Sequence, residues 1–464
     1  MSEKCVYRYS KVIRKKTLKV ASTSEQAPLL HDACFLLHDL FCTRSEAMAS
    51  RRVLPTASGL AEAGRWLREG RLVAFPTETV YGLGANALDD AAVRSIFRAK
   101  GRPLTDPVIV HVPTTEHALE LLDLDAAARS VFVQLADRFW PGPLTLIAKA
   151  RASVPLTVSA GTGFIGMRRP AHPIAQALLL EANVPVAAPS ANRFGHVSPT
   201  SCEHVLADLG EHGILVLDGE AGDGDDDATS SSEAFASSRT CTVGIESTVA
   251  KLDMSCGELV ILRRGGVSEH ALRDAVSSIA WDGGADDAEG RSTMRLRVQS
   301  KARVPHDTEE GQVAPGQMLT HYAPDVRTYL VATDAAAAAT AATTTAAEAG
   351  AADDTLLLTA PLGTCVLLDC GAQLSSLAAS ALAYRDLSDT ADSVEVAQQL
   401  FDALRWAEAV VGAETVLLVD SDATHGQHSA AVHDRMFRAA SGQRVALRVV
   451  GTDVQLRSAP TEEE

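Results

Sequence analysis

Segments with the two-residue period of a β-strand alternate with segments of helical period along residues 57–270, and this alternation limits the fold more than any other feature. Helices are predicted at residues 61–69, 90–99 and 174–181, and strands at residues 71–75, 108–112, 144–148 and 184–188. Strands that alternate with helices indicate an α/β domain in which helices pack on a sheet.

The chain has 464 residues, which is enough for more than one domain. Further strands predicted at residues 328–331, 364–368 and 416–419 indicate a second, smaller α/β domain. An acidic, Gly- and Ser-rich stretch at residues 219–241 cannot bury enough apolar area to order itself and is predicted to be a surface insertion. We therefore expect an N-terminal extension (1–50), a first α/β domain with this insertion (57–275), a variable segment and linker (276–325) and a C-terminal domain (326–464).

The formal net charge of −17 argues against generic coating of nucleic acid, and we expect weak or no direct nucleic-acid binding. No long apolar run predicts a membrane helix, and eight cysteines without a C-x-x-C pair suit a reducing compartment. These features favour a cytoplasmic protein. The basic residues before Ser24 leave two readings open, a solvated arm or an organelle-targeting segment that would give a mitochondrial pool.

The segment from Gly82 to Ala87 has the G-x-G-x-x-A spacing of a dinucleotide-binding turn and follows a predicted strand. The acidic residue that would bind a ribose about 20 residues later is missing, and Arg98, Lys100 and Arg102 occupy that region instead. We therefore predict a turn that needs permissive glycines rather than a dinucleotide site.

Three loop segments beside predicted strand ends concentrate groups that suit an anionic ligand. They are the hydroxyl-rich segment 76–84, the Lys100-Gly101-Arg102 segment and the segment 189–192, which carries Ser190 and Asn192. Two cations on either side of a glycine can meet one phosphate chain, with Lys as a point charge and Arg as a bidentate donor. The arginine pairs at 168–169 and 263–264 add positive charge, and together these segments predict a phosphate-binding site.

The chain resembles the threonylcarbamoyl-AMP synthases, a family with a YrdC-like domain and an additional C-terminal domain. PTETVYGLG, AKGRP, FWPGPLT, MRRPAHP, APSAN, SPT, IEST and ILRRGG follow one another in the family's order, and APGQMLTHYAP resembles its interdomain linker. The resemblance implies a YrdC-like twisted mixed sheet with flanking helices, followed by a smaller Rossmann-like α/β/α domain. Two departures are Asp106, where the family often has Asn, and Arg264, where Pro is usual.

The resemblance also implies the reaction and the roles of individual residues. Such enzymes join L-threonine, bicarbonate or CO2 and ATP into threonylcarbamoyl-AMP with release of pyrophosphate, with Mg2+ accompanying ATP and no metal ligand assigned in the protein. The product goes to the transferase machinery that makes threonylcarbamoyladenosine at position 37 of tRNA. The implied threonine site is Thr79, His111, Arg168, Ala188 and Ser247; the implied ATP site is Lys100, Arg102, Asp106, Ser190, Asn192, Ser198, Arg263 and Tyr322, with Lys100 and Arg102 catalytic.

One alternative belongs to another class of protein. A YrdC-like domain with a basic concave face would suit a double-stranded RNA or tRNA-binding module. The charge of −17 argues against that role as the main one. Salt dependence would separate the two hypotheses, because binding to a polyanion weakens steeply as salt rises.

Overall fold

The computed structural model describes residues 49–220, 241–281, 292–299, 311–316, 321–332, 356–420 and 424–459. Residues 50–464 form one compact unit. The predicted N-terminal extension before residue 49, the insertion between residues 221 and 240 and linker residues 317–320 lie outside the described residues. Within the described part of the chain, no helix is both long and apolar enough to cross a membrane.

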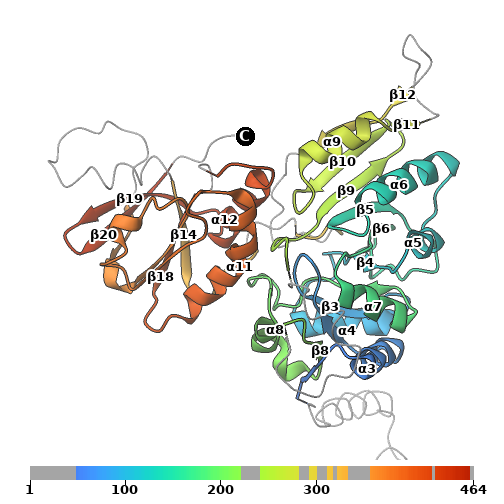
Figure 1. Cartoon of the computed structure of the whole chain (residues 1–464), viewed down its shortest axis with the longest axis horizontal. Coiled ribbons are helices and arrows are strands. Elements are labelled where there is room, and N and C mark those ends of the chain that lie inside the picture. The colour runs from blue at the N-terminus through green and yellow to red at the C-terminus, as the bar shows by residue number, and fades with distance from the viewer. Residues whose placement is uncertain are drawn as a thin grey trace, which may run out of the picture. The chain divides into compact units, whose positions relative to one another are not determined.

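The first domain is built on an 11-stranded sheet with the order β1-β8-β2-β3-β7-β4-β6-β5-β9-β10-β13 (Figure 1). Parallel and antiparallel pairs both occur, so the sheet is mixed, as the resemblance implies. The strands are β1 (Arg51–Val53), β2 (Val73–Phe75), β3 (Gly82–Asn86), β4 (Val110–His111), β5 (Leu144–Lys149), β6 (Phe164–Arg168), β7 (Val186–Ala187), β8 (Leu215–Leu217), β9 (Thr248–Asp253), β10 (Glu258–Arg263) and β13 (Arg295–Val298). A separate two-stranded sheet pairs β11 (Ala280–Trp281) with β12 (Ser292–Thr293).

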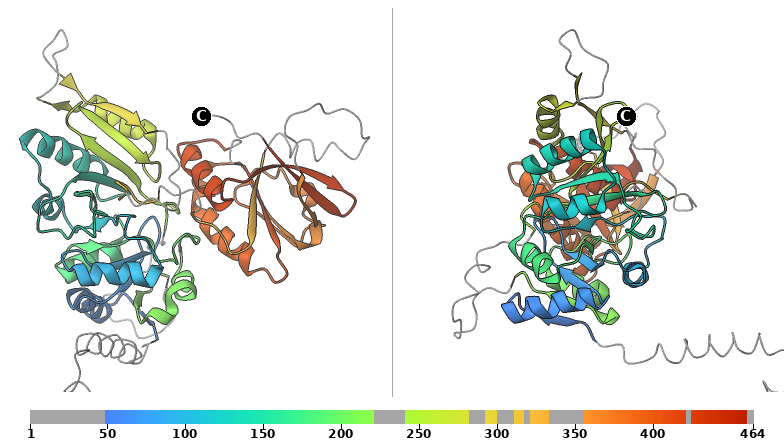
Figure 2. Two further views of the ribbon diagram at one scale, coloured as in Figure 1. Left: turned by 180° about the vertical axis from the view of Figure 1, so that it is seen from behind. Right: turned by 90° about the vertical axis from the view of Figure 1, so that its right-hand side faces the viewer.

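Two layers of helices cover the two faces of this sheet, because alternate residues of a strand point to opposite faces. In β2, Ala74 belongs to one core cluster, whereas Val73 and Phe75 belong to the other. The Ala74 side is packed by α4 (Asp90–Lys100), α5 (Thr115–Leu121), α6 (Ala126–Phe139), α8 (Cys202–Leu209) and α9 (Glu269–Ser277), and the other side by α3 (Ala57–Arg68) and α7 (Pro173–Ala182). Figure 2 shows these helices from behind and from the side.

The C-terminal domain has a seven-stranded sheet with the order β15-β20-β19-β14-β18-β16-β17. Strands β14, β16, β17, β18 and β19 run parallel, and β15 and β20 add an antiparallel edge. The elements are β14 (Arg327–Val331), β15 (Leu356–Pro361), β16 (Cys365–Asp369), β17 (Ala383–Asp386), α11 (Ser393–Ala409), β18 (Thr415–Val419), α12 (Ser429–Ala439), β19 (Arg444–Val450) and β20 (Asp453–Ser458).

Long periodic segments agree with the sequence prediction better than short ones. The helix predicted at residues 90–99 is α4, which Asp89 caps by accepting hydrogen bonds from Ala91 N and Ala92 N. The helix predicted from residue 61 begins earlier, at Ala57, because Thr56 accepts from Gly59 N and fixes the first turn there. The strand predicted at residues 108–112 is reduced to the two residues of β4.

One sequence prediction was wrong, and one segment expected to be variable contains an additional strand. The segment from Gly82 to Asn86 is the strand β3 and not a turn, and it pairs antiparallel with β2. A Cβ on Gly84 would lie 2.8 Å from Val186 Cγ1, so this glycine allows close packing rather than an unusual φ. The variable segment and linker expected at residues 276–325 contains β13, which pairs parallel with β10 at the edge of the sheet.

Candidate active site

The candidate active site lies where polar residues alternate with core residues along three neighbouring strands. In β5, Leu144 and Leu146 enter the apolar core, so Thr145 between them points to the opposite face. In the same way, His111 follows core residue Val110 in β4, and Arg168 follows Met167 in β6. These polar side chains are all buried. A sheet face with buried polar groups is the kind of surface on which a polar ligand can be held.

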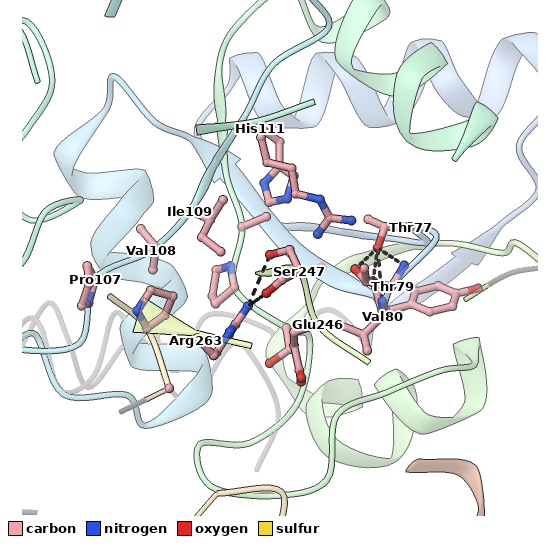
Figure 3. Close-up of a pocket in the computed structure, with 18 of the residues that line it drawn as sticks. Thr77, Thr79, Val80, Pro107, Val108, Ile109, His111, Glu246, Ser247 and Arg263 are labelled. Carbon is pink, nitrogen blue, oxygen red and sulfur yellow. Dashed lines mark hydrogen bonds between the residues drawn. The ribbon is translucent and has the colours of Figure 1, made fainter. Parts of the chain in front are cut away.

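A cavity that is partly open to solvent lies in this region (Figure 3). Loops after β2 and β7, the loop before β9 and the interdomain linker all contribute to it. It is lined by Thr77, Thr79, Val80, Tyr81, Gly82, Arg102, Pro107, Val108, Ile109, His111, Arg168, Ala188, Pro189, Ser190, Glu246, Ser247, Arg263, Pro315, Gly316 and His321.

Arg168 is held by a buried ion pair with Glu78. The Arg168 Nη2 atom lies 2.7 Å from Glu78 Oε1, and both side chains are almost completely buried. The second carboxylate oxygen, Glu78 Oε2, accepts from Ala171 N at 3.0 Å. Glu78 therefore fixes one side of the guanidinium group, and Nε donates to Gly142 O at 3.4 Å, which leaves Nη1 for an anion in the cavity.

Arg102 also has a buried acidic partner, Asp106, at 3.0 Å. Its Nε donates to Asp106 O at 3.1 Å and its Nη2 donates to Pro107 O at 2.6 Å, so Arg102 holds the loop that leads to β4. Burial raises the pKa of Asp106, against the opposing effect of the Arg102 charge. Burial lowers the pKa of Arg102.

Lys100 is directed differently from Arg102 and does not line the cavity. Its Nζ donates to Ser190 O at 2.6 Å, Asn192 O at 2.5 Å and Asn192 Oδ1 at 3.3 Å. An ammonium group has three donors, and these three oxygens use them all. Lys100 therefore holds the 190–192 loop, and burial lowers its pKa well below the usual value.

Ser247, the residue before β9, also lines the cavity. Its Oγ is 2.8 Å from Thr145 Oγ1, and Arg263 Nη2 donates to Ser247 O at 2.8 Å (Figure 3). Burial lowers the pKa of Arg263. Burial and the nearby Arg168 charge lower the pKa of His111 to about 3, so His111 is neutral at physiological pH.

The structure brings most of the predicted site residues to the cavity wall. Eight of them line it: Thr79, Arg102, His111, Arg168, Ala188, Ser190, Ser247 and Arg263. Lys100, Asp106, Asn192, Ser198 and Tyr322 are buried but do not line it. Tyr322 packs against Phe401 with ring centroids 5.2 Å apart, and its hydroxyl has no hydrogen-bond partner in the described part of the chain.

Sequence reasoning missed several residues of this site. Glu78 and Glu246 both stand inside the quoted motifs, but no role was assigned to either of them. Thr145 could have been found as the polar residue in the apolar strand LTLIA. His321 lines the cavity instead of its neighbour Tyr322, and burial lowers the pKa of His321 well below its usual value.

The fold and site together define an α/β protein whose first domain has a cavity lined by buried cations and hydroxyl groups, a lining that suits a small anionic ligand. Comparisons with known proteins agree with that class. A family model described as telomere recombination matches residues 65–231, and one for the C-terminal domain of threonylcarbamoyl-AMP synthase matches residues 270–441. The chain belongs to the threonylcarbamoyl-AMP synthase family.

Individual relatives cover different parts of the chain. The threonylcarbamoyl-AMP synthase of Bacillus subtilis is 38% identical over 268 residues, which are 57% of this chain and 64% of the relative. The chain thus spans slightly less than two thirds of that relative's length. A putative threonylcarbamoyl-AMP synthase of Mycobacterium tuberculosis is 38% identical over 162 residues, which are 34% of this chain and 72% of that relative. A crystal structure of Pyrococcus abyssi Sua5 complexed with L-threonine has a TM-score of 0.63 and 29% identity, and the match covers 86% of this chain and 99% of that one.

Proposed function

We propose that the protein is a threonylcarbamoyl-AMP synthase, which joins L-threonine, bicarbonate or CO2 and ATP and releases pyrophosphate. The observation that carries this proposal is one cavity lined by three buried arginines, Arg102, Arg168 and Arg263, with hydroxyl groups between them. The reaction needs sites for an amino-acid carboxylate and a triphosphate in one enclosed space. The threonine bound in the Pyrococcus relative supports the amino-acid part of the proposal.

The chemistry requires placement rather than a side-chain nucleophile. The amine of threonine attacks the carbon of CO2 and loses a proton, or attacks bicarbonate with loss of water, to form a carbamate. A carbamate oxygen then attacks the α-phosphorus as pyrophosphate leaves. We assign Arg168 to the threonine carboxylate, because a guanidinium group can bind both oxygens at once. Arg102 and Arg263 then neutralise the charge that grows on the phosphates during the transfer.

Mg2+ is proposed to enter with ATP. Of the described residues that line the cavity, only Glu246 has a carboxylate, and its two oxygens already accept from Ser198 and Arg435. Mg2+ usually keeps several waters and binds substrate phosphates together with one or two carboxylates. This donor set fits an ion carried by the nucleotide, whose charge would help the arginines stabilise the departing pyrophosphate.

The product would pass to the transferase machinery that modifies position 37 of tRNA. The test of the proposed function is pyrophosphate release from ATP, measured with threonine and with bicarbonate omitted in turn. We expect release only with the full set of substrates and Mg2+. Release that does not depend on threonine would refute the proposal, and tight binding to tRNA that weakens steeply with salt would favour the RNA-binding alternative.

A further inference from the structure

A carboxylate in a cavity for anionic substrates needs an explanation. Glu246 lines the cavity and is only 7% exposed, beside Ser247 and within the wall that carries Arg263. An uncompensated negative charge at this position would repel the triphosphate and the threonine carboxylate through a medium of low dielectric constant. The contacts of Glu246 show how the fold deals with this charge.

Both oxygens of the Glu246 carboxylate are occupied. Oε1 accepts from Ser198 Oγ at 2.7 Å, and Oε2 accepts from Arg435 Nε at 3.1 Å. Burial opposes ionisation, but the charges of Arg435 and Arg263 outweigh it and lower the pKa of Glu246. The carboxylate is therefore ionised and paired at neutral pH.

Arg435 comes from α12 of the C-terminal domain, 189 residues away from Glu246 in the sequence. Its side chain is completely buried, and its Nη1 donates to Arg264 O at 2.7 Å and to Asp434 Oδ2 at 3.1 Å. Its guanidinium carbon lies 5.6 Å from the ring centroid of Tyr322, a linker residue. Moving this buried arginine away from the Glu246 carboxylate would leave both charges buried and unpaired, which would destabilise the folded protein.

We propose that Arg435 is a positioning residue for the active site: by pairing with Glu246 it cancels the one negative charge on the described cavity wall and fixes the segment that carries Ser247. This proposal rests on the proposed function, because it takes ATP to be the anionic ligand. Under this proposal the C-terminal domain contributes to nucleotide binding, although Arg435 does not contact the nucleotide directly.

A double-mutant cycle on Arg435 and Glu246 tests the proposal, with ATP affinity measured by calorimetry on the full chain. Arg435→Met leaves an unpaired carboxylate on the wall, and we expect ATP to bind about tenfold more weakly or worse. Glu246→Gln removes the negative charge, and we expect ATP binding at least as tight as in the wild type. The double variant should bind ATP within about threefold of Glu246→Gln, because the repelling charge is gone.

Arg405→Met is a matched control. Arg405 is a buried arginine of α11 that donates to Val197 O and Asp208 Oδ2, and among the described residues it makes no hydrogen bond to Glu246. The effect of Arg405→Met on ATP affinity should add to the effect of Glu246→Gln. Glu246→Gln should not restore ATP affinity to the Arg405→Met variant. If Arg435→Met does not fold, Arg435→Lys keeps the charge with poorer geometry and should show a smaller loss of ATP affinity.

The decisive comparison is between the double variant and Arg435→Met. Equal, weak ATP binding in both would overturn the proposal, because it would mean that Arg435 acts only through packing. This comparison needs ATP binding and not turnover. Failure of the wild type to release pyrophosphate would therefore count against the proposed function and not against the pairing of Arg435 with Glu246.

Discussion

At the scale of single residues, the buried charges of this site are arranged as acid–base pairs with one member on the cavity wall. Arg168 pairs with Glu78, Arg102 with Asp106, and Glu246 with Arg435. Removing one member of a buried pair leaves an uncompensated charge and costs more than replacing both members. The effect of a single substitution should therefore include the cost of leaving the partner's charge unpaired as well as the loss of the substituted side chain.

Substitution of Lys100 should affect stability first. The sequence predicts that Lys100 belongs to a phosphate-binding site, but its ammonium group donates to three oxygens of Ser190 and Asn192. A buried acceptor without its donor costs about 1–3 kcal/mol, so Lys100→Met should lower the free energy of unfolding by about 2 kcal/mol or more. Lys149→Met is the control, because its exposed pair with Asp123 contributes at most about 1 kcal/mol. Urea unfolding of both variants measures the difference, and equal stabilities would contradict this assignment.

Substitution of Arg168 should affect threonine use. Arg168→Lys keeps a charge near Glu78 but loses the planar fork that can hold Glu78 and a substrate carboxylate together. We expect the KM for threonine to rise by about tenfold or more while the KM for ATP changes little. Arg169→Lys provides the control, because Arg169 is adjacent in sequence but does not line the cavity. A rise in the KM for ATP alone would show that the cavity is divided between the substrates in another way.

At the scale of elements, the prediction from sequence was most accurate where periodicity extended over several turns or strand residues. Helix α4 and strand β18 were found nearly to the residue because Asp89 caps one and a run of buried apolar residues forms the other. The two-residue strands β4 and β7 are too short to show a period. Strand β3 was missed because Gly82 and Gly84 resemble turn residues, whereas here they permit close packing.

The loop before β9 is held against α11 by a glycine that a larger residue cannot replace. Gly244 has a φ of +75°, and a Cβ there would lie 2.2 Å from Ala397 O. Gly244→Ala should therefore force the loop off the helix and shift Glu246, two residues further on. We expect a loss of stability above about 2 kcal/mol together with weaker ATP binding.

The control for Gly244 has the same backbone conformation without the close neighbour. Gly163 also has a φ of +75°, but a Cβ there meets no atom within 4 Å. Gly163→Ala should cost only the backbone strain, about 1–2 kcal/mol. Thermal unfolding and ATP titration of both variants separate the effect of backbone strain from the effect of displacing the loop before β9. Indistinguishable variants would mean that the contact with α11 has no effect on the site.

At the scale of the whole molecule, the contacts that complete the site join residues far apart in the sequence. The motifs indicated the cavity residues Arg168 and Ser247, because each stands in a recognisable local pattern. No local pattern marked Arg435 or Arg405, whose partners lie 189 and 197 residues away. Such pairs depend on tertiary packing of two sheets, and a single sequence carries no periodic signal for them.

His196 supplies a pH-dependent contact between the two domains. Its Nδ1 lies 2.9 Å from Asp208 Oδ2 and its Nε2 lies 3.0 Å from Glu408 Oε2. Carboxylates only accept hydrogen bonds, so both contacts are satisfied only by the doubly protonated imidazolium. Burial lowers the pKa of His196, as does the charge of Arg405, but the hydrogen bonds to Asp208 and Glu408 outweigh these effects and raise it.

Because the folded protein raises the pKa of His196 above its unfolded value of about 6.5, its contribution to stability is complete below that pH. The contribution is lost as pH rises through the folded pKa, so the difference in melting temperature between the wild type and His196→Gln should be largest near pH 6 and should shrink toward pH 9. Histidines with lowered pKa values, such as His111 and His172, titrate in both proteins and cancel in this difference. His270→Gln, at an exposed pair with Asp274, should show almost no difference at any pH. The opposite result is a difference in melting temperature between wild type and His196→Gln that grows as pH rises. It would show that His196 is neutral in the folded protein and does not form a charged contact with both Asp208 and Glu408.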